Sequence, residues 1–286
     1  MKKKLLTILL ACAMTASLAA CGGTSSTGSA SADSETAETG ADASASVDVD
    51  DTEAVEPTGM GVVYTADTVK NDGVMTYEEY DAAELDTEVT IEAYVQATQS
   101  WWEDQITVYA EDDEGGYFIY NMACSEEDSY KLTPGAKIKV TGYKSEWSGE
   151  VEIIDATFEL EDGVYLADPV DVTDVLGKDA LIKYQNLYVN FVDMVVEPST
   201  DADGKEAAFL YNWDGSGSQG DDLYFNVSYN GATYTFVVES YLCGADTEVY
   251  QAVEALEIGQ TLDMTGFLYW YNGPNPHITQ IYVTSE

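Results

Sequence analysis

Aromatic side chains gather at three breaks in the alternating pattern of predicted strands. Flat rings at such turns stack on the faces of sugars or bases, and a Tyr hydroxyl or a Trp N–H orients a polar ligand. Packing into the hydrophobic core is the alternative for each ring. Because consecutive strand residues point to opposite faces, at least one of Trp101 and Trp102 should be exposed. The candidate ligand-binding residues are Trp101, Trp102, Trp147, Tyr269, Trp270 and Tyr271.

Carboxylates cluster in two Gly-containing segments, residues 201–206 and 214–222. Clustered oxygen ligands of this kind suit Ca²⁺. Neither segment has the ligand spacing of an EF-hand, so a solvent-exposed acidic loop is the preferred interpretation of both. The candidate metal ligands of the calcium alternative are Asp201, Asp203, Asp221 and Asp222. Apart from that alternative, we expect no cofactor.

Few residues suit catalysis. His277 is the single histidine, which excludes a metal site built from several histidines and leaves a serine triad only one base. Its place before the predicted last strand favours a structural or surface imidazole. The 53 acidic residues leave a pair for glycoside hydrolysis open, yet no pair stands out. The sequence therefore nominates no catalytic residue.

The elements that position these side chains are short strands with period-two alternation, in which one face is buried and the other is wet. In the first half, a helix over residues 125–131 separates three strands from two. The first-half strands are residues 89–95, 106–110, 117–121, 138–142 and 151–153. The second half repeats this order with strands at residues 187–191, 223–227, 234–238, 262–266 and 278–283, a helix at 246–256 and an extra segment at 208–210. Further short helices at residues 77–83 and 174–177 could cap an open end of a barrel.

An internal repeat divides this body into two domains. Residues 132–143 align without a gap with residues 256–267, at an offset of 124. The second copy is longer, and residues 204–220 are the insertion that accounts for the difference. We therefore predict a first domain at residues 60–162 and a second at residues 163–286.

Three strands, a helix and a hairpin form an order that resembles the OB-fold, a five-stranded Greek-key barrel. The stretch from Leu132 to Tyr143 is similar to the fourth strand of bacterial OB domains. The fold class is thus mainly β, with two tandem OB-like barrels and short helices. The resemblance implies that ligands bind on the face of strands 2 and 3 and in the loops joining strands 1 to 2 and 4 to 5. The whole chain also resembles cell-surface lipoproteins of anaerobic Firmicutes, which implies no particular activity.

The chain is strongly acidic, with 53 Asp and Glu against 11 Lys and Arg, and a formal net charge of −42. All of its basic residues are lysines. Such a chain repels phosphate backbones at long range and lacks the planar guanidinium that binds phosphate bidentately. We therefore expect that nucleic acid is not a partner. Solubility and repulsion from an anionic cell surface are the preferred interpretation of this charge.

The N-terminal residues indicate export. Lys2, Lys3 and Lys4 precede an apolar run that ends at Cys21, and the segment resembles the lipobox of bacterial lipoproteins. This predicts a signal peptide of residues 1–20 and a lipid on Cys21, which would hold the protein at the outer face of the cytoplasmic membrane. An ordinary secretory peptide cut near Ala20 is the alternative. Residues 21–59 lack large apolar side chains over most of their length and predict a disordered, acidic linker.

These features favour a non-catalytic binding module that presents aromatic barrel rims to a neutral ligand, either a glycan or a surface protein. A structural envelope protein that docks to another surface component is the second hypothesis, and a hydrolase is the third. We expect a monomer whose only membrane contact is the lipid. Cys124 and Cys243 fall in different domains, which excludes an intradomain disulfide. Buried free thiols are the preferred interpretation, and an interdomain bridge is the alternative.

Overall fold

The structure is a computed structural model that describes residues 65–284, and Met60–Glu286 forms one compact unit. The predicted signal peptide, the predicted lipidation site Cys21 and the linker of residues 21–59 lie outside the described residues. Between residues 65 and 284, the helices are too short or too polar for any of them to cross a membrane.

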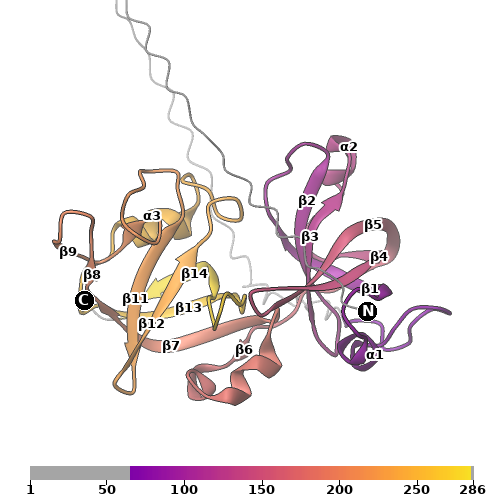
Figure 1. Ribbon diagram of the computed structural model, residues 1–286, viewed down its shortest axis with the longest axis horizontal. Coiled ribbons are helices and arrows are strands. Elements are labelled where there is room, and N and C mark those ends of the chain that lie inside the picture. The colour runs from indigo at the N-terminus through magenta and orange to yellow at the C-terminus, as the bar shows by residue number, and fades with distance from the viewer. Residues whose placement is uncertain (1–64, 285–286) are drawn as a thin grey trace, which may run out of the picture. The chain divides into compact units, whose positions relative to one another are not determined.

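The first copy of the repeat closes into a five-stranded barrel (Figure 1). β1 (Glu88–Thr98) pairs antiparallel with both β2 (Gln105–Glu111) and β4 (Ala136–Trp147). β3 (Gly116–Ala123) pairs antiparallel with β2 and parallel with β5 (Glu150–Val164), and β5 pairs with β4. This order, β1-β2-β3-β5-β4, is that of an OB-fold barrel.

The second copy has the same topology. β7 (Tyr188–Glu197) pairs with β11 (Leu223–Tyr229) and with β13 (Thr261–Phe267), and β12 (Ala232–Val238) pairs with β11. β14 (His277–Val283) pairs antiparallel with β13 and parallel with β12. Since the β11–β7 pairing closes the ring, the prediction of two OB-like barrels is confirmed.

The predicted helices begin at side-chain caps. Thr76 forms a capping box ahead of α1 (Tyr77–Ala82), while Ser125 and Thr247 cap α2 (Glu126–Ser129) and α3 (Glu248–Glu254). The segment predicted as a helix at residues 174–177 is a single 3₁₀ turn. The remaining short elements are β6 (Val170–Asp171), η1 (Thr173–Val175), η2 (Asp179–Tyr184), β8 (Ser199–Thr200), β9 (Glu206–Ala207) and β10 (Leu210–Tyr211).

Two pairs of glycines explain why the repeat is visible in the sequence. Gly135 and Gly259 have φ of +91° and +92°, a backbone conformation that residues other than glycine rarely adopt. Each donates its N–H to a carbonyl of its barrel's first strand, that of Val95 at 2.7 Å or that of Val196 at 2.9 Å. Seven residues later, a Cβ on Gly142 or Gly266 would collide with β5 or with the residues that begin β14.

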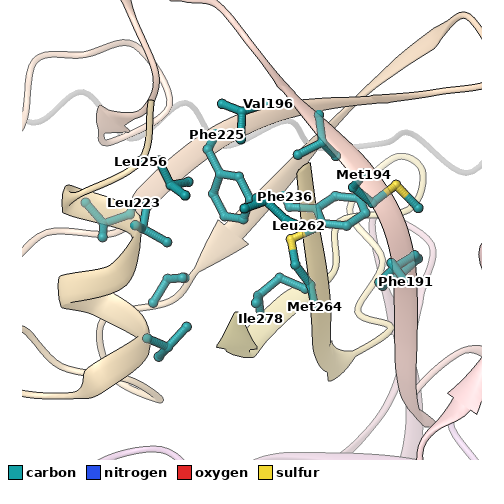
Figure 2. Close-up of a cluster of buried hydrophobic side chains, with 14 of the residues drawn as sticks. Phe191, Met194, Val196, Leu223, Phe225, Phe236, Leu256, Leu262, Met264 and Ile278 are labelled. Carbon is teal, nitrogen blue, oxygen red and sulfur yellow. The ribbon is translucent and has the colours of Figure 1, made fainter. Parts of the chain in front are cut away.

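Each barrel has its own hydrophobic core. Figure 2 shows the second core, in which Phe225 and Phe236 lie among aliphatic and Met side chains from the surrounding strands and Leu256 adds to it from just after α3. The first core includes Tyr80 of α1, as expected if that helix covers an open barrel end. Cys124 and Cys243 are buried free thiols, one packed against each core.

A third apolar cluster joins the two barrels. Tyr109 of β2 stacks on Phe267 of β13 with ring centroids 4.5 Å apart, and Phe118 of β3 meets Tyr269 edge-on at 5.1 Å. Tyr109, Phe118 and Phe267 are almost completely buried. Burial of large rings between the barrels stabilises one relative orientation of the two.

Buried carboxyl groups cross the same boundary. Glu111 of β2 accepts a hydrogen bond from the Tyr188 N–H, and Glu150 of β5 accepts one from the Trp270 N–H at 2.8 Å. Burial raises the pKa of each carboxyl to about 8. The second oxygen of Glu150, Oε1, has no hydrogen-bond partner among the described residues. Both groups therefore favour their protonated, uncharged forms at the interface.

These carboxyls should make the folded state less stable as the pH rises. An unfolded Glu loses its proton near 4.5, whereas folded Glu150 holds it until about 8, so stability is full below 4.5 and is lost as the pH passes through 8. We predict that Glu150→Gln raises the free energy of unfolding at pH 9 by roughly 1 kcal/mol or more and changes it little at pH 5. Urea titrations at both pH values measure this.

Glu159→Gln is the matched control, because Glu159 is an exposed residue of the same strand and its substitution removes the same charge away from the interface. Equal effects of the two substitutions at pH 9 would contradict the role given to Glu150.

Candidate ligand-binding groove

A large groove lies between the two barrels, with a volume of about 1350 Å³. On the first barrel it is bordered by β2, β3, the β1–β2 connection and the end of β4. On the second it is bordered by β11, β12, the β13–β14 turn and the start of β14. In both barrels these are the surfaces that the OB resemblance implied for ligand binding. Drug-sized ligands occupy pockets of about 300–1,000 Å³, so this groove has room for a longer ligand.

Tight turns present the rings of this groove, which we call the aromatic groove. Trp102 directly precedes a turn whose two central residues, Glu103 and Asp104, both have positive φ. Trp147 precedes Ser148 and Gly149, and Tyr271 precedes Asn272 and Gly273, all four again at positive φ. Two-residue turns of this hand match the twist of a hairpin and hold the flanking side chains in place.

Four of the six predicted ligand-binding residues line the aromatic groove, namely Trp102, Trp147, Tyr269 and Tyr271. Trp102, Trp147 and Tyr271 have exposed fractions of 66%, 61% and 52%, so their rings are free to contact a ligand. Tyr269 is half-buried and stacks on His277 with centroids 4.3 Å apart.

The other two predicted residues lie outside the groove. The Trp101 indole N–H donates to the Cys124 carbonyl at 2.8 Å, and its ring packs against the first core. Trp270 packs against the second core and against Gly149, where an added Cβ would lie 2.8 Å from the indole. Their neighbours Trp102 and Tyr271 are exposed, although all four residues lie in the connections between strands and not in regular strands.

Sequence reasoning missed several rings of the groove. Trp213 belongs to the predicted insertion and is 76% exposed, and Tyr241 follows β12. Tyr120, Tyr224 and Tyr234 come from outer faces of strands, where a tyrosine is unremarkable in sequence. Only the occurrence of a lone tryptophan within a Gly-rich insertion could have signalled Trp213.

The polar part of the lining is made of amides and hydroxyls rather than cations. None of the eight lysines among the described residues lines the groove, and Glu239 is its one carboxylate. The amides come from Gln99, Gln105, Asn121 and Asn275, and hydroxyls come from Ser100, Thr107, Thr233, Thr235 and the tyrosines.

His277 lines the groove and ties the two barrels together. Its Nδ1 lies 2.7 Å from the Tyr109 hydroxyl, and the Gln99 amide donates to that same hydroxyl at 3.5 Å. This directs the Tyr109 proton towards Nδ1 and leaves the imidazole hydrogen on Nε2. Burial lowers the pKa of His277 to about 3, so the ring is neutral at physiological pH. The predicted structural role of this imidazole agrees with these contacts.

Three of the four candidate metal ligands accept hydrogen bonds, and the carboxylate of the fourth, Asp203, lies 3.6 Å from the Lys205 ammonium. Asp201 accepts from the N–H groups of Asp203 and Lys205, Asp221 accepts from Ser218, and Asp222 accepts from Ser240. From residue 65 to residue 284, no three His, Cys, Asp or Glu side chains are grouped so as to hold a metal ion. The acidic segments thus act as turns that their own carboxylates stabilise.

No family model and no curated protein matches the sequence. Among solved structures, the chain is similar to the HINa domain of Ifi202 in complex with 20-base-pair double-stranded DNA, with 11% identity and a TM-score of 0.32 over 71% of this chain and 97% of that one. A murine DNA-binding protein bound to double-stranded DNA matches with 11% identity and a TM-score of 0.33, over 69% and 97% of the two chains. The p202 HIN1 domain in complex with 12-mer double-stranded DNA matches with 11% identity and a TM-score of 0.33, over 72% of this chain and 96% of that one.

These structures contradict the prediction that nucleic acid is not a partner. HIN domains share the OB-fold, and three of these neighbours were solved with double-stranded DNA. The exclusion was wrong because it rested on net charge and on the absence of arginine, which describe the whole chain and not any one surface. At such low identity the likeness concerns the fold and not the ligand.

The protonation of His277 can be measured directly, because it is the only histidine of the chain. We predict that its imidazole keeps the hydrogen on Nε2 and does not titrate between about pH 5 and pH 8. The sign follows from the folded pKa of about 3, below the ordinary 6.5: the stability conferred by the neutral ring is full above pH 6.5, decreases as the pH falls below that value and is lost as the pH falls through about 3. Long-range ¹H–¹⁵N spectra report both tautomer and titration.

Tyr109→Phe serves as the comparison, because it removes the hydroxyl that bonds Nδ1 while keeping the stacked ring. Its spectrum should show a changed Nδ1 signal. A wild-type midpoint near pH 6.5 would contradict the buried, neutral assignment.

Proposed function

We propose that this protein is a lipid-anchored, non-catalytic module that binds a glycan in the aromatic groove. The observation that carries the proposal is the lining, which combines exposed rings with amides and hydroxyls and includes no lysine. Flat rings cover the apolar faces of pyranose sugars, while amides and hydroxyls both donate to and accept from sugar hydroxyls.

The distribution of the rings supports a chain-like ligand. Trp102 and Trp147 belong to the first barrel, and Trp213 and Tyr271 belong to the second. A ligand long enough to stack on rings of both barrels gains affinity from each contact without a new ordering cost for the protein, because the barrels already pack against each other. The groove volume of about 1350 Å³ agrees with several sugar units rather than one.

The proposal of a membrane anchor is based on the sequence alone. Lys2–Lys4, the apolar run and Cys21 have the order of a lipoprotein signal, and the linker of residues 21–59 would let the barrels reach beyond the membrane surface. A tethered binding module at the outer face of the cytoplasmic membrane would meet cell-wall or environmental polysaccharides.

Glycan binding can be tested by tryptophan fluorescence during titration with oligosaccharides, using the chain from residue 21 onwards with Cys21→Ser so that it stays in solution. We predict that Trp102→Ala and Tyr271→Ala each weaken binding by roughly three- to tenfold, since one aromatic contact contributes about 0.5–1.5 kcal/mol. Both rings are exposed, so the thermal stability of the variants should change little.

Tyr282→Ala is the matched control, because Tyr282 is 61% exposed but does not line the groove. A glycan array that gives no binding would contradict the proposal, as would binding that all three variants retain. In parallel titrations, binding of a DNA oligonucleotide or of a co-purifying surface protein at Trp102 and Tyr271, without glycan binding, would assign the groove to that partner instead.

A further inference from the structure

The one carboxylate of the aromatic groove lacks a counter-ion. Glu239 follows β12 and lines the groove. Its Oε2 accepts the Leu242 N–H at 2.8 Å, which fixes the carboxyl group in place. The ion pairs formed by lysines of residues 65–284 all involve other carboxylates. Nothing cationic in the described part of the chain therefore neutralises Glu239.

In its surroundings, a negative charge on Glu239 without a counter-ion is unfavourable. Burial and the nearby charge of Asp222 together raise the pKa of its carboxyl to about 7. Burial raises the pKa of the Tyr109 and Tyr224 hydroxyls and of the Cys243 thiol, and the negative charge of Glu239 adds to each shift. A bound cation would relieve this concentration of negative charge.

Aromatic rings that line the same groove as Glu239 are also suited to an organic cation. Tyr224, Tyr241 and Tyr269 line the same groove. The faces of aromatic rings carry negative charge density and attract ammonium groups, and proteins recognise such cations with cages of aromatic side chains. The surplus of acidic residues over the whole chain adds a long-range field that attracts cations to the protein.

We propose that the ligand of the aromatic groove is a glycan that carries free amino groups, and that Glu239 binds one of its ammonium groups. The inference rests on the proposed function, since it specifies the class of sugar that the groove binds. Glu239 is thus a specificity-determining residue, which selects an unacetylated amino sugar over the same sugar with a neutral substituent.

Three β-1,4-linked hexasaccharides of equal length separate the possibilities, because they differ only in the group at C2. These are the hexamer of glucosamine, the hexamer of N-acetylglucosamine and cellohexaose. In calorimetric titrations at pH 7, we expect the chain from residue 21 with Cys21→Ser to bind the glucosamine hexamer at least about tenfold more tightly than the other two, as a charge-assisted hydrogen bond provides.

Glu239→Gln should abolish this preference while leaving binding of the two neutral hexamers within about twofold. The amide oxygen of Gln still accepts the Leu242 N–H, so the local fold is kept, and circular dichroism melts check it. Glu257→Gln is the matched control, because it removes one charge from an exposed residue of the same barrel that does not line the groove. That variant should retain the preference.

Each of the remaining outcomes would contradict one particular statement made above. Equal binding of all three hexamers by the wild type would overturn the amino-sugar inference and leave the glycan proposal standing. A preference that persists in Glu239→Gln, or that is also lost in Glu257→Gln, would show that Glu239 does not determine it. Spermine competing as well as the glucosamine hexamer would mean that the ammonium alone is bound. If none of the three hexamers binds, the proposed function itself is contradicted.

Discussion

The groove exists because two barrels pack against each other through a dry aromatic layer. Tyr109 of the first barrel lies against Phe267 and His277 of the second, and its hydroxyl is hydrogen-bonded to His277 across the boundary. If these rings separated, a buried hydroxyl and an imidazole nitrogen would each lose a hydrogen bond, and large apolar faces would meet water. The relative position of Trp102 and Tyr271, on opposite barrels, depends on this contact.

The same boundary is unusual for an acidic chain because it buries carboxyl groups. Glu111 and Glu150 accept backbone N–H groups from the opposite barrel, which orients them, but burial keeps them protonated. Two ionised carboxylates there would each have to lose their hydration without a cation in return. These hydrogen bonds help to fix the position of one barrel against the other, and their strength depends on pH because the carboxyls titrate.

Charge and shape act at different scales in this molecule. The surplus of acidic residues sets a long-range field, whereas the groove itself presents mostly neutral groups and one fixed carboxylate, Glu239. The exclusion of nucleic acid was drawn from net charge and from the absence of arginine, and neither describes the surface of the groove. Specificity depends on the groups within hydrogen-bonding distance of the ligand. There, the few groups that line the site matter more than the net charge of the chain.

The sequence by itself determined the elements that depend on neighbours along the chain. Period-two alternation fixed the main strands, capping residues fixed three helices, and the repeated glycines fixed the turns and close approaches that make two copies of one barrel. These features could be predicted because their causes are local backbone geometry and the burial of one face of a strand.

Only the tertiary structure decided which rings meet in one groove. Trp101 is turned inward because the Cys124 carbonyl accepts its N–H, and Trp270 packs on Gly149 of the other barrel. Tyr109 and His277 are 168 residues apart in sequence, and nothing in the local pattern of either residue specifies the other. The packing of the barrels brings Trp213 and Glu239 into the groove. Such contacts arise from the fit of whole surfaces, which the order of residues along one strand does not encode.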